Sequence, residues 1–137
     1  MDGAILVGHS YGGMVITGVA DRLAERLAHL VYLDASVPLP GESWASPHPA
    51  HIREARRQRP QPGGVYEDPL VFDAARVGAL PRTFIDCTAP ALETITPSRE
   101  RARTQPGWRY AEIATGHDAM ISAPAMLLEL LYTSIFF

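Results

Sequence analysis

The sequence predicts an α/β fold, a mostly parallel sheet flanked by helices, and three observations indicate it. Short unbroken apolar runs, of which Ala4–Val7 and Leu30–Leu33 are the first two, are typical of parallel strands buried on both faces. A stretch with apolar residues at helical spacing separates these runs, so strand, helix and strand follow one another within about 30 residues. The chain has 137 residues, 47% of them hydrophobic, which suffices for the core of one domain.

The first helix follows a glycine-rich turn after Ala4–Val7 and is predicted from Gly13 to about Leu27. Its charged residues lie away from an apolar stripe, the pattern of a helix with one side against a sheet. The second strand, Leu30–Leu33, comes directly after this helix and ends at Asp34. The stripe that we expect to face the sheet consists of Val15, Val19, Leu23 and Leu27.

Residues 38–81 break this alternation and are rich in proline. Seven of the twelve prolines of the chain fall between Pro38 and Pro69, and His48–Arg59 is a basic piece with helical potential. The stretch is too long for an ordinary loop, so it is either an inserted lid or partly disordered. We therefore expect a single domain over residues 1–137, with a lid-like insertion at 38–81.

Regular elements return after the insertion. Arg82–Cys87 reads as a third strand, and Pro97 suits the first turn of a helix. Trp108–Ile113 alternates enough between apolar and polar residues to be the fourth strand. Ser122 and Pro124 then open the last helix.

The turn between the first strand and the first helix carries a motif that points to chemistry. The five residues Gly8–Gly12 match G-x-S-x-G, with a buried strand before them and a helix after them, as a nucleophile elbow requires. In such an elbow the serine occupies a strained turn that lifts its hydroxyl above the strand ends. We expect Ser10 to be a nucleophile and the backbone N–H of Tyr11 to donate a hydrogen bond to an oxyanion.

A serine nucleophile needs a general base, and five histidines are available. His117 stands in a Gly-His-Asp loop just after the fourth strand, and a chain order with serine first and histidine last fits this kind of site. His9 lies inside the elbow and is expected to point elsewhere, while His29 at a helix end suits a cap or surface role. His48 and His51 lie in the proline-rich stretch without a third ligand nearby, so we predict no metal site there. We therefore expect His117 to be the base.

Three segments carry a resemblance to a known family: Gly8–Met14, His29–Ala35 and Thr115–Met120. They are similar to α/β-hydrolases related to plant methyl-ester esterases and hydroxynitrile lyases, whose bacterial members are mostly esterase-like. The resemblance implies the C-terminal part of an α/β-hydrolase fold, because that family has about four strands and two helices before its elbow. We therefore expect an N-terminally truncated hydrolase that lacks the second oxyanion donor.

Relatives in this family usually place the triad acid in the loop after the strand that corresponds to Arg82–Cys87. Here that loop reads Thr88–Glu93, with no aspartate at its first positions. Glu93 lies in the right loop but late, and Asp34 ends the strand after the elbow helix, a position that supplies the acid in some α/β-hydrolases. We rank Asp34 and Glu93 equally, with Asp86 behind them because a strand residue can point to the wrong face.

The resemblance and the motif together imply a serine hydrolase that acts on small carboxylic esters. In that reading Ser10 attacks, His117 carries the proton, and Asp34 or Glu93 orients the imidazole. This chemistry needs no cofactor and no metal. The alternative is a catalytically inactive, truncated remnant. Without earlier strands, Ala4–Val7 would present an apolar edge, so we expect either a homo-oligomer through this edge or a separate chain that completes the sheet.

Charge and composition exclude several other classes of protein. The net charge of −3 gives no basic footprint for nucleic acid and no polybasic patch for a membrane. The apolar end, Met126–Phe137, is shorter than the roughly 20 residues of a spanning helix, and we see no secretory signal. We therefore expect a cytoplasmic protein whose single cysteine, Cys87, is a core residue rather than a reactive thiol.

Overall fold

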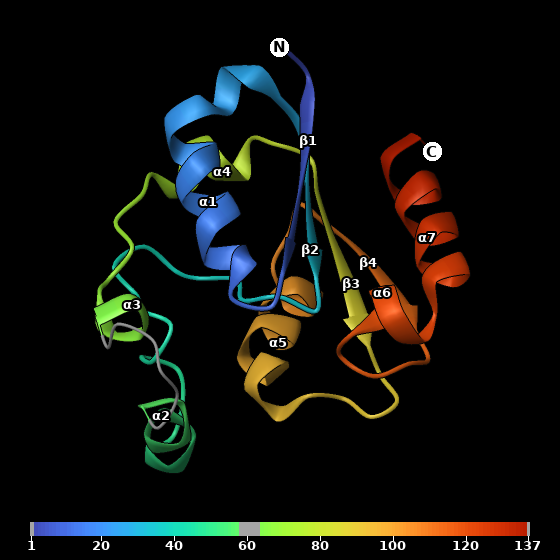
Figure 1. Ribbon diagram of the computed structural model, residues 1–137. Coiled ribbons are helices and arrows are strands. Elements are labelled where there is room, and N and C mark those ends of the chain that lie inside the picture. The colour runs from blue at the N-terminus through green and yellow to red at the C-terminus, as the bar shows by residue number, and fades with distance from the viewer. Residues whose placement is uncertain (1, 58–63, 137) are drawn as a thin grey trace.

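Four strands form one sheet at the centre of the described part of the chain (Figure 1). The structure is a computed structural model that describes residues 2–57 and 64–136. All the strand pairings are parallel, in the spatial order β1-β2-β3-β4, so the carboxyl ends of the strands lie at one edge of the sheet. The strands are β1 (Ala4–His9), β2 (Leu27–Leu33), β3 (Arg82–Cys87) and β4 (Trp108–Ile113).

Helices cover both faces of this sheet (Figure 1). The five that do so are α1 (Gly12–Leu23), α4 (Ala74–Gly78), α5 (Thr96–Thr104), α6 (Ala119–Ser122) and α7 (Pro124–Phe136). On one face, α1, α4 and α5 surround a buried cluster that contains Ile16, Val77 and Ala102. On the other face, α6 and α7 cover a second cluster through Ala119 and Leu127.

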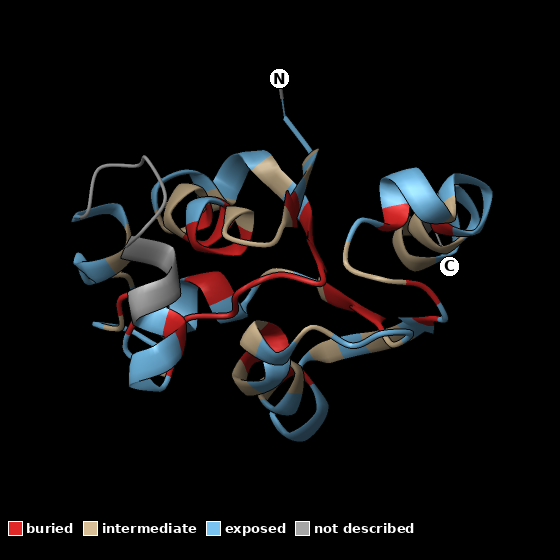
Figure 2. Cartoon of the chain, turned by 60° about the horizontal axis from the view of Figure 1, so that its bottom comes forward, coloured by how far each residue is buried: buried red, intermediate tan, exposed pale blue. Residues whose placement is uncertain are grey.

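The alternation of side chains along β2 explains why its apolar run is unbroken. Leu30 and Tyr32 belong to the cluster beside α1, whereas Val31 and Leu33 belong to the cluster beside α7, and all four are buried. Burying each such side chain contributes roughly 1.5–3 kcal/mol. Figure 2 shows the buried residues concentrated in the middle of the sheet, with exposed residues on the outer sides of the helices. The predicted α/β class, a parallel sheet flanked by helices, is confirmed.

The structure confirms the predicted elements around the sheet and shifts several of their boundaries. β1, for example, ends at His9 rather than at Val7. The third and fourth strands have the predicted bounds. β2 begins earlier than predicted, at Leu27. Consequently α1 ends at Leu23, and a 3-10 turn, Ala24–Arg26, takes the place of the last predicted helical turn.

The face that α1 buries differs from the predicted one. Val15 is 54% exposed, so the apolar stripe to which it belongs does not face the sheet. Small residues decide the orientation: a Cβ at Gly13 would lie 2.0 Å from the carbonyl oxygen of Ser36, and the Thr17 hydroxyl lies 2.8 Å from that of Tyr32. The close approach of the α1 backbone at Gly13 to the backbone of Ser36, just after β2, therefore determines which side of α1 is buried. Its buried residues are Gly13, Met14, Ile16, Thr17 and Ala20.

The insertion predicted at 38–81 lies between β2 and β3, and residues 58–63 of it lie outside the described residues. Buried Trp44 shares a hydrophobic cluster with Met14, which attaches the insertion to the first turn of α1. The insertion contains α4 and two further helices, α2 (Ala50–Arg57) and α3 (Gly64–Glu67).

A short helix that the sequence did not predict, α6, precedes the last helix. Ser122 ends α6 instead of opening the last helix, and α7 begins at Pro124. The Ser122 hydroxyl hydrogen-bonds to that of Thr115. In α7, Leu127 joins the core while Leu128 on the outer side is exposed. None of the helices in the described ranges is both long and apolar enough to cross a membrane.

Replacing Gly13 with alanine is expected to lower the free energy of unfolding by about 2 kcal/mol or more, because the new Cβ would lie 2.0 Å from the Ser36 carbonyl oxygen. Gly12→Ala is the matched control: nothing lies within 4 Å of its Cβ position, and alanine favours a helix over glycine. Urea unfolding followed by circular dichroism measures both variants. Equal stability of the two would contradict the close approach described above.

Candidate active site

Ser10 occupies a strained turn between β1 and α1. Its φ of 56° lies in the left-handed region, which residues other than glycine rarely adopt. A Cβ at Gly8 would lie 2.7 Å from the Gly12 carbonyl oxygen, so the turn can be this tight only with glycine at position 8. The Ser10 carbonyl accepts hydrogen bonds from the N–H groups of Gly13 (3.2 Å) and Ser36 (2.9 Å). This geometry is that of the turn between strand and helix that the motif predicts.

Asp34 occupies the corresponding position on the neighbouring strand. It follows β2 directly with a φ of 40°, and among the described residues only Ser10 shares a positive φ without being glycine. The Asp34 N–H donates to the Ile85 carbonyl at 2.8 Å, so β3 fixes its backbone, and its side chain is fully buried. Strain of this kind, roughly 1–3 kcal/mol per residue, is concentrated at functional sites in proteins.

His117 reaches this carboxylate from the loop after β4. Its Nδ1 lies 2.7 Å from Oδ2 of Asp34. Because a carboxylate accepts hydrogen bonds, we assign the ring hydrogen of this pair to Nδ1. The loop passes over the end of β3, where the Ala89 N–H donates to the Thr115 carbonyl at 3.0 Å. His117 thus uses one ring nitrogen for Asp34 and keeps Nε2 for a second partner.

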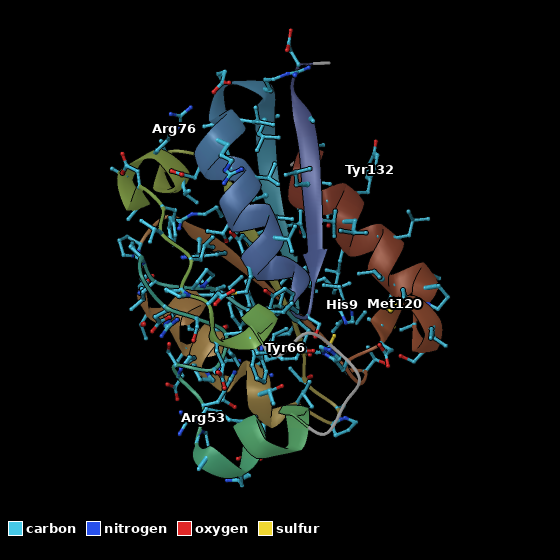
Figure 3. The ribbon with its side chains drawn as sticks, turned by 60° about the vertical axis from the view of Figure 1, so that its left-hand side comes forward. His9, Arg53, Tyr66, Arg76, Met120 and Tyr132 are labelled. Atoms are coloured by element: carbon cyan, nitrogen blue, oxygen red, sulfur yellow. The ribbon has the colours of Figure 1, made fainter. Side chains whose placement is uncertain are left out.

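His9 supports the His117 loop from the elbow. Its Nε2 lies 2.9 Å from the carbonyl oxygen of His117, and the centroids of the two rings are 4.3 Å apart. Figure 3 shows the labelled His9 at the end of the β1 arrow, on the side of the molecule where Met120 also lies. Sequence reasoning expected His9 to point elsewhere and missed this contact. The available signal was its place one residue before Ser10 at the end of a strand.

Three of the four candidate catalytic side chains therefore meet at one edge of the sheet. Ser10, Asp34 and His117 follow β1, β2 and β4, whose carboxyl ends lie together. His9, the neighbour of Ser10 in the chain, contacts His117 directly. His117 and Asp34 are hydrogen-bonded to each other. Among the described residues, no hydrogen bond joins Ser10 Oγ to His117 Nε2.

Glu93, the other carboxylate ranked first for the acid, lies away from this pair. It begins a 3-10 turn, Glu93–Ile95, and its side chain is 75% exposed. Its Oε1 is 4.0 Å from Nε2 of His51 in α2, so its nearest basic partner belongs to the insertion. The structure brings Asp34, and not Glu93, to His117.

Two buried titratable side chains of the sheet, Cys87 at the carboxyl end of β3 and His29 near the start of β2, belong to the core. Burial raises the pKa of the Cys87 thiol to about 12, with the carboxylates of Asp34 and Asp86 adding to the effect, so the thiol stays protonated near neutral pH. The predicted core role of Cys87 is confirmed. His29 lies inside β2, where burial lowers its pKa and its Nε2 is 2.9 Å from Thr83 Oγ1. Its predicted cap or surface role is wrong, because β2 begins before it.

A groove of about 410 Å³ opens beside the elbow, between α1 and residues 65–71. Tyr11 lines it, with its ring edge-on to Tyr66 at 5.6 Å and its hydroxyl donating to the Val65 carbonyl at 2.8 Å. Because Tyr11 directly follows Ser10, the groove begins next to the strained turn. Across residues 2–57 and 64–136, no three or more His, Cys, Asp or Glu side chains are grouped so as to hold a metal ion.

Comparison with known proteins identifies the family. A model of the alpha/beta hydrolase family matches residues 1–132. The chain belongs to this family. This alpha/beta hydrolase is 34% identical to a carbendazim hydrolyzing esterase from Nocardioides sp. (strain SG-4G). The match covers 94% of this chain and 70% of the esterase. The aligned stretch has 174 residues, more than the 137 of this whole chain, so the esterase carries segments within it that this hydrolase lacks.

Solved structures share the alpha/beta hydrolase fold with this chain. An extracellular alpha/beta-hydrolase from a Paenibacillus species matches with a TM-score of 0.78 at 19% identity, over 100% of this chain and 74% of the other. A methylesterase from Arabidopsis matches with a TM-score of 0.67 at 19% identity, over 98% of this chain and 70% of the other. The expected membership of the alpha/beta hydrolase family is confirmed, and a plant methylesterase shares the fold.

Proposed function

We propose that this alpha/beta hydrolase cleaves small carboxylic esters with a triad of Ser10, His117 and Asp34. The observation that carries the proposal is the 2.7 Å contact between His117 Nδ1 and Asp34 Oδ2, at the strand end beside the Ser10 turn. A carboxylate, an imidazole and a hydroxyl delivered to one sheet edge are the parts that acyl transfer needs. The similarity to an esterase at 34% identity supports esters as the substrate class.

The proposed reaction follows from the positions of these groups. His117, with its hydrogen on Nδ1, takes the Ser10 hydroxyl proton on Nε2 while Oγ attacks the ester carbonyl. Collapse of the tetrahedral intermediate releases the alcohol, which receives that proton. Water, deprotonated by the same Nε2, then attacks the acyl group. When the second tetrahedral intermediate collapses, Nε2 returns that proton to Ser10 Oγ and the carboxylic acid leaves. In unliganded enzymes the contact between nucleophile and base is often long and tightens when substrate binds.

Two further groups stabilise the charges of this reaction in our proposal. Asp34 keeps the imidazole of His117 in one orientation and balances the positive charge that forms on it. The Tyr11 N–H, next to the nucleophile, donates to the oxyanion of the tetrahedral intermediate. α1 begins at Gly12 with no acidic residue in its first turn, so its N-terminal dipole also favours negative charge there.

We propose that the insertion 38–81 acts as a lid and shapes the pocket over the elbow. The rings of Trp44 and Tyr66 are 5.1 Å apart, and Tyr66 in turn contacts Tyr11 beside the nucleophile. Met14 and Ile52 belong to the same buried cluster as Trp44, and Tyr66 and Tyr11 pack against that cluster. An apolar wall of this kind suits the hydrocarbon part of an ester.

The purified chain is expected to hydrolyse a short-chain p-nitrophenyl ester, and Ser10→Ala is expected to lower kcat by several orders of magnitude because the nucleophile is lost. Release of p-nitrophenol measures both rates at equal protein concentration. Ser134→Ala on α7 is the control for loss of a hydroxyl outside the site, and it should keep the full rate. Equal background rates from the unmodified chain and Ser10→Ala would rule out the enzyme reading for this chain.

Asp34→Asn is expected to lower kcat by roughly 10³–10⁴-fold, because the amide can no longer hold His117 in the tautomer that a base needs. Glu93→Gln, at an exposed carboxylate paired with His51, should change kcat by less than about twofold. The same ester assay compares the two variants. A large loss in Glu93→Gln with full activity in Asp34→Asn would reverse the assignment of the acid.

The open edge of β1 supports a second candidate function. In the described residues β1 pairs only with β2, and Ile5 (36%) and Val7 (47%) are exposed along it. An unpaired strand with apolar side chains favours pairing with another chain. In this alternative the chain is a catalytically silent member of the family, or a subunit that self-associates or is completed by a second polypeptide.

If the β1 edge joins copies of the chain, size-exclusion chromatography with light scattering is expected to give a dimer or larger species. Val7→Lys should then shift the chain toward monomer, since a charge on an edge strand opposes pairing. Val71→Lys, at an 80% exposed position in the insertion, is the control and should leave the elution unchanged. A monomeric unmodified chain over a wide concentration range would refute the pairing.

A further inference from the structure

We propose that Arg99 is a positioning residue that fixes the Asp34 carboxylate in the orientation that His117 needs. This inference rests on the proposed triad. Arg99 lies on α5, a helix that contributes none of the three triad residues, and its side chain is only 12% exposed. In the proposal it contacts neither substrate nor the reacting atoms, and it acts only through Asp34.

The two oxygens of Asp34 have different surroundings. Oδ2 contacts Nδ1 of His117 at 2.7 Å. Oδ1 accepts a long hydrogen bond, 3.4 Å, from the Cys87 N–H and lies 3.6 Å from Nη2 of Arg99. Because the Asp34 side chain is fully buried, the nearby guanidinium balances a charge that water cannot reach. Attraction of Oδ1 toward Arg99 therefore leaves Oδ2 turned toward His117.

Asp86 holds the guanidinium in this place. Nε of Arg99 lies 2.6 Å from Asp86 Oδ1, and Nη1 lies 3.3 Å from Thr96 Oγ1. The Tyr110 hydroxyl donates to the other oxygen of Asp86 at 2.6 Å. Burial, and then the bond to Asp86, raise the pKa of Tyr110, so it remains a donor at neutral pH. Both oxygens of Asp86 therefore have hydrogen-bond partners, one from Arg99 and one from Tyr110.

If Arg99 only stabilised the fold by pairing with Asp86, the position of its Nη2 next to Asp34 would have no explanation. Nη2 of Arg99 is buried and makes no hydrogen bond within the described residues, yet it is the guanidinium nitrogen that lies 3.6 Å from Oδ1 of Asp34. Arg103 shows what an ordinary partner of Asp86 looks like: it is 49% exposed, 3.5 Å from Asp86, and also bound to Glu112. Of the two arginines, only Arg99 lies within 4 Å of both Asp86 and Asp34.

Arg99→Met tests the proposal through a signal that does not depend on turnover, the low-field proton resonance of His117 Nδ1–H. We expect the unmodified chain to show this resonance and His117→Gln to lack it. Arg99→Met should lose or strongly broaden it, and kcat should fall at least about tenfold with KM within about twofold. Arg103→Ala, which removes the exposed cation on Asp86, is the matched control and should keep both the resonance and kcat.

Arg99→Lys decides the question if Arg99→Met does not fold. Its compact ammonium keeps the charge but cannot reach Asp86 and Asp34 together as a planar guanidinium does, so the resonance should move and kcat should fall several-fold. An unchanged resonance and kcat in either folded variant would overturn the role of Arg99 and leave the triad intact. A resonance absent from the unmodified chain would overturn the Asp34–His117 pair itself, and with it both proposals.

Discussion

The candidate site depends on how closely the turn after β1 approaches the end of β2. The Ser36 N–H donates to the Ser10 carbonyl at 2.9 Å, and no side chain fits at Gly13, where a Cβ would lie 2.0 Å from the Ser36 carbonyl oxygen. This contact holds two strained residues, Ser10 and Asp34, at the ends of adjacent parallel strands. Because parallel strands end at one edge, the loop after β4 can deliver His117 to the same place.

Burial of charge is the second constraint on the site. Asp34 and Asp86 are both almost completely buried, and an unpaired buried carboxylate costs several kcal/mol. One guanidinium, that of Arg99, lies within 4 Å of both. α5 therefore covers one face of the sheet through Ala102 and also places a cation between two carboxylates of neighbouring strands. The stability of the sheet edge and the orientation of the site depend on the same helix.

Local sequence patterns were enough to predict the sheet, the turn at Ser10 and the loop of His117, because each depends on a few consecutive residues. They could not choose between Asp34 and Glu93. Both residues follow strand ends, and the choice depends on how far the loop of His117 reaches across the sheet. The contact of His9 was missed for the same reason: it joins residues far apart in the chain. Tertiary packing, rather than propensity, decides such contacts.

The sequence pattern predicted the wrong buried face for α1, and there is a physical reason for this. This helix is apolar on two sides, since Met14 and Ile16 are buried while Val15 is more than half exposed, and a helix of this kind is typical of positions covered from both sides. β1 repeats the pattern: Leu6 packs on the cluster beside α1, whereas Val7 on the opposite face is exposed. Val15 lines the groove beside residues 65–71, so the outer apolar side of α1 faces the insertion rather than the sheet.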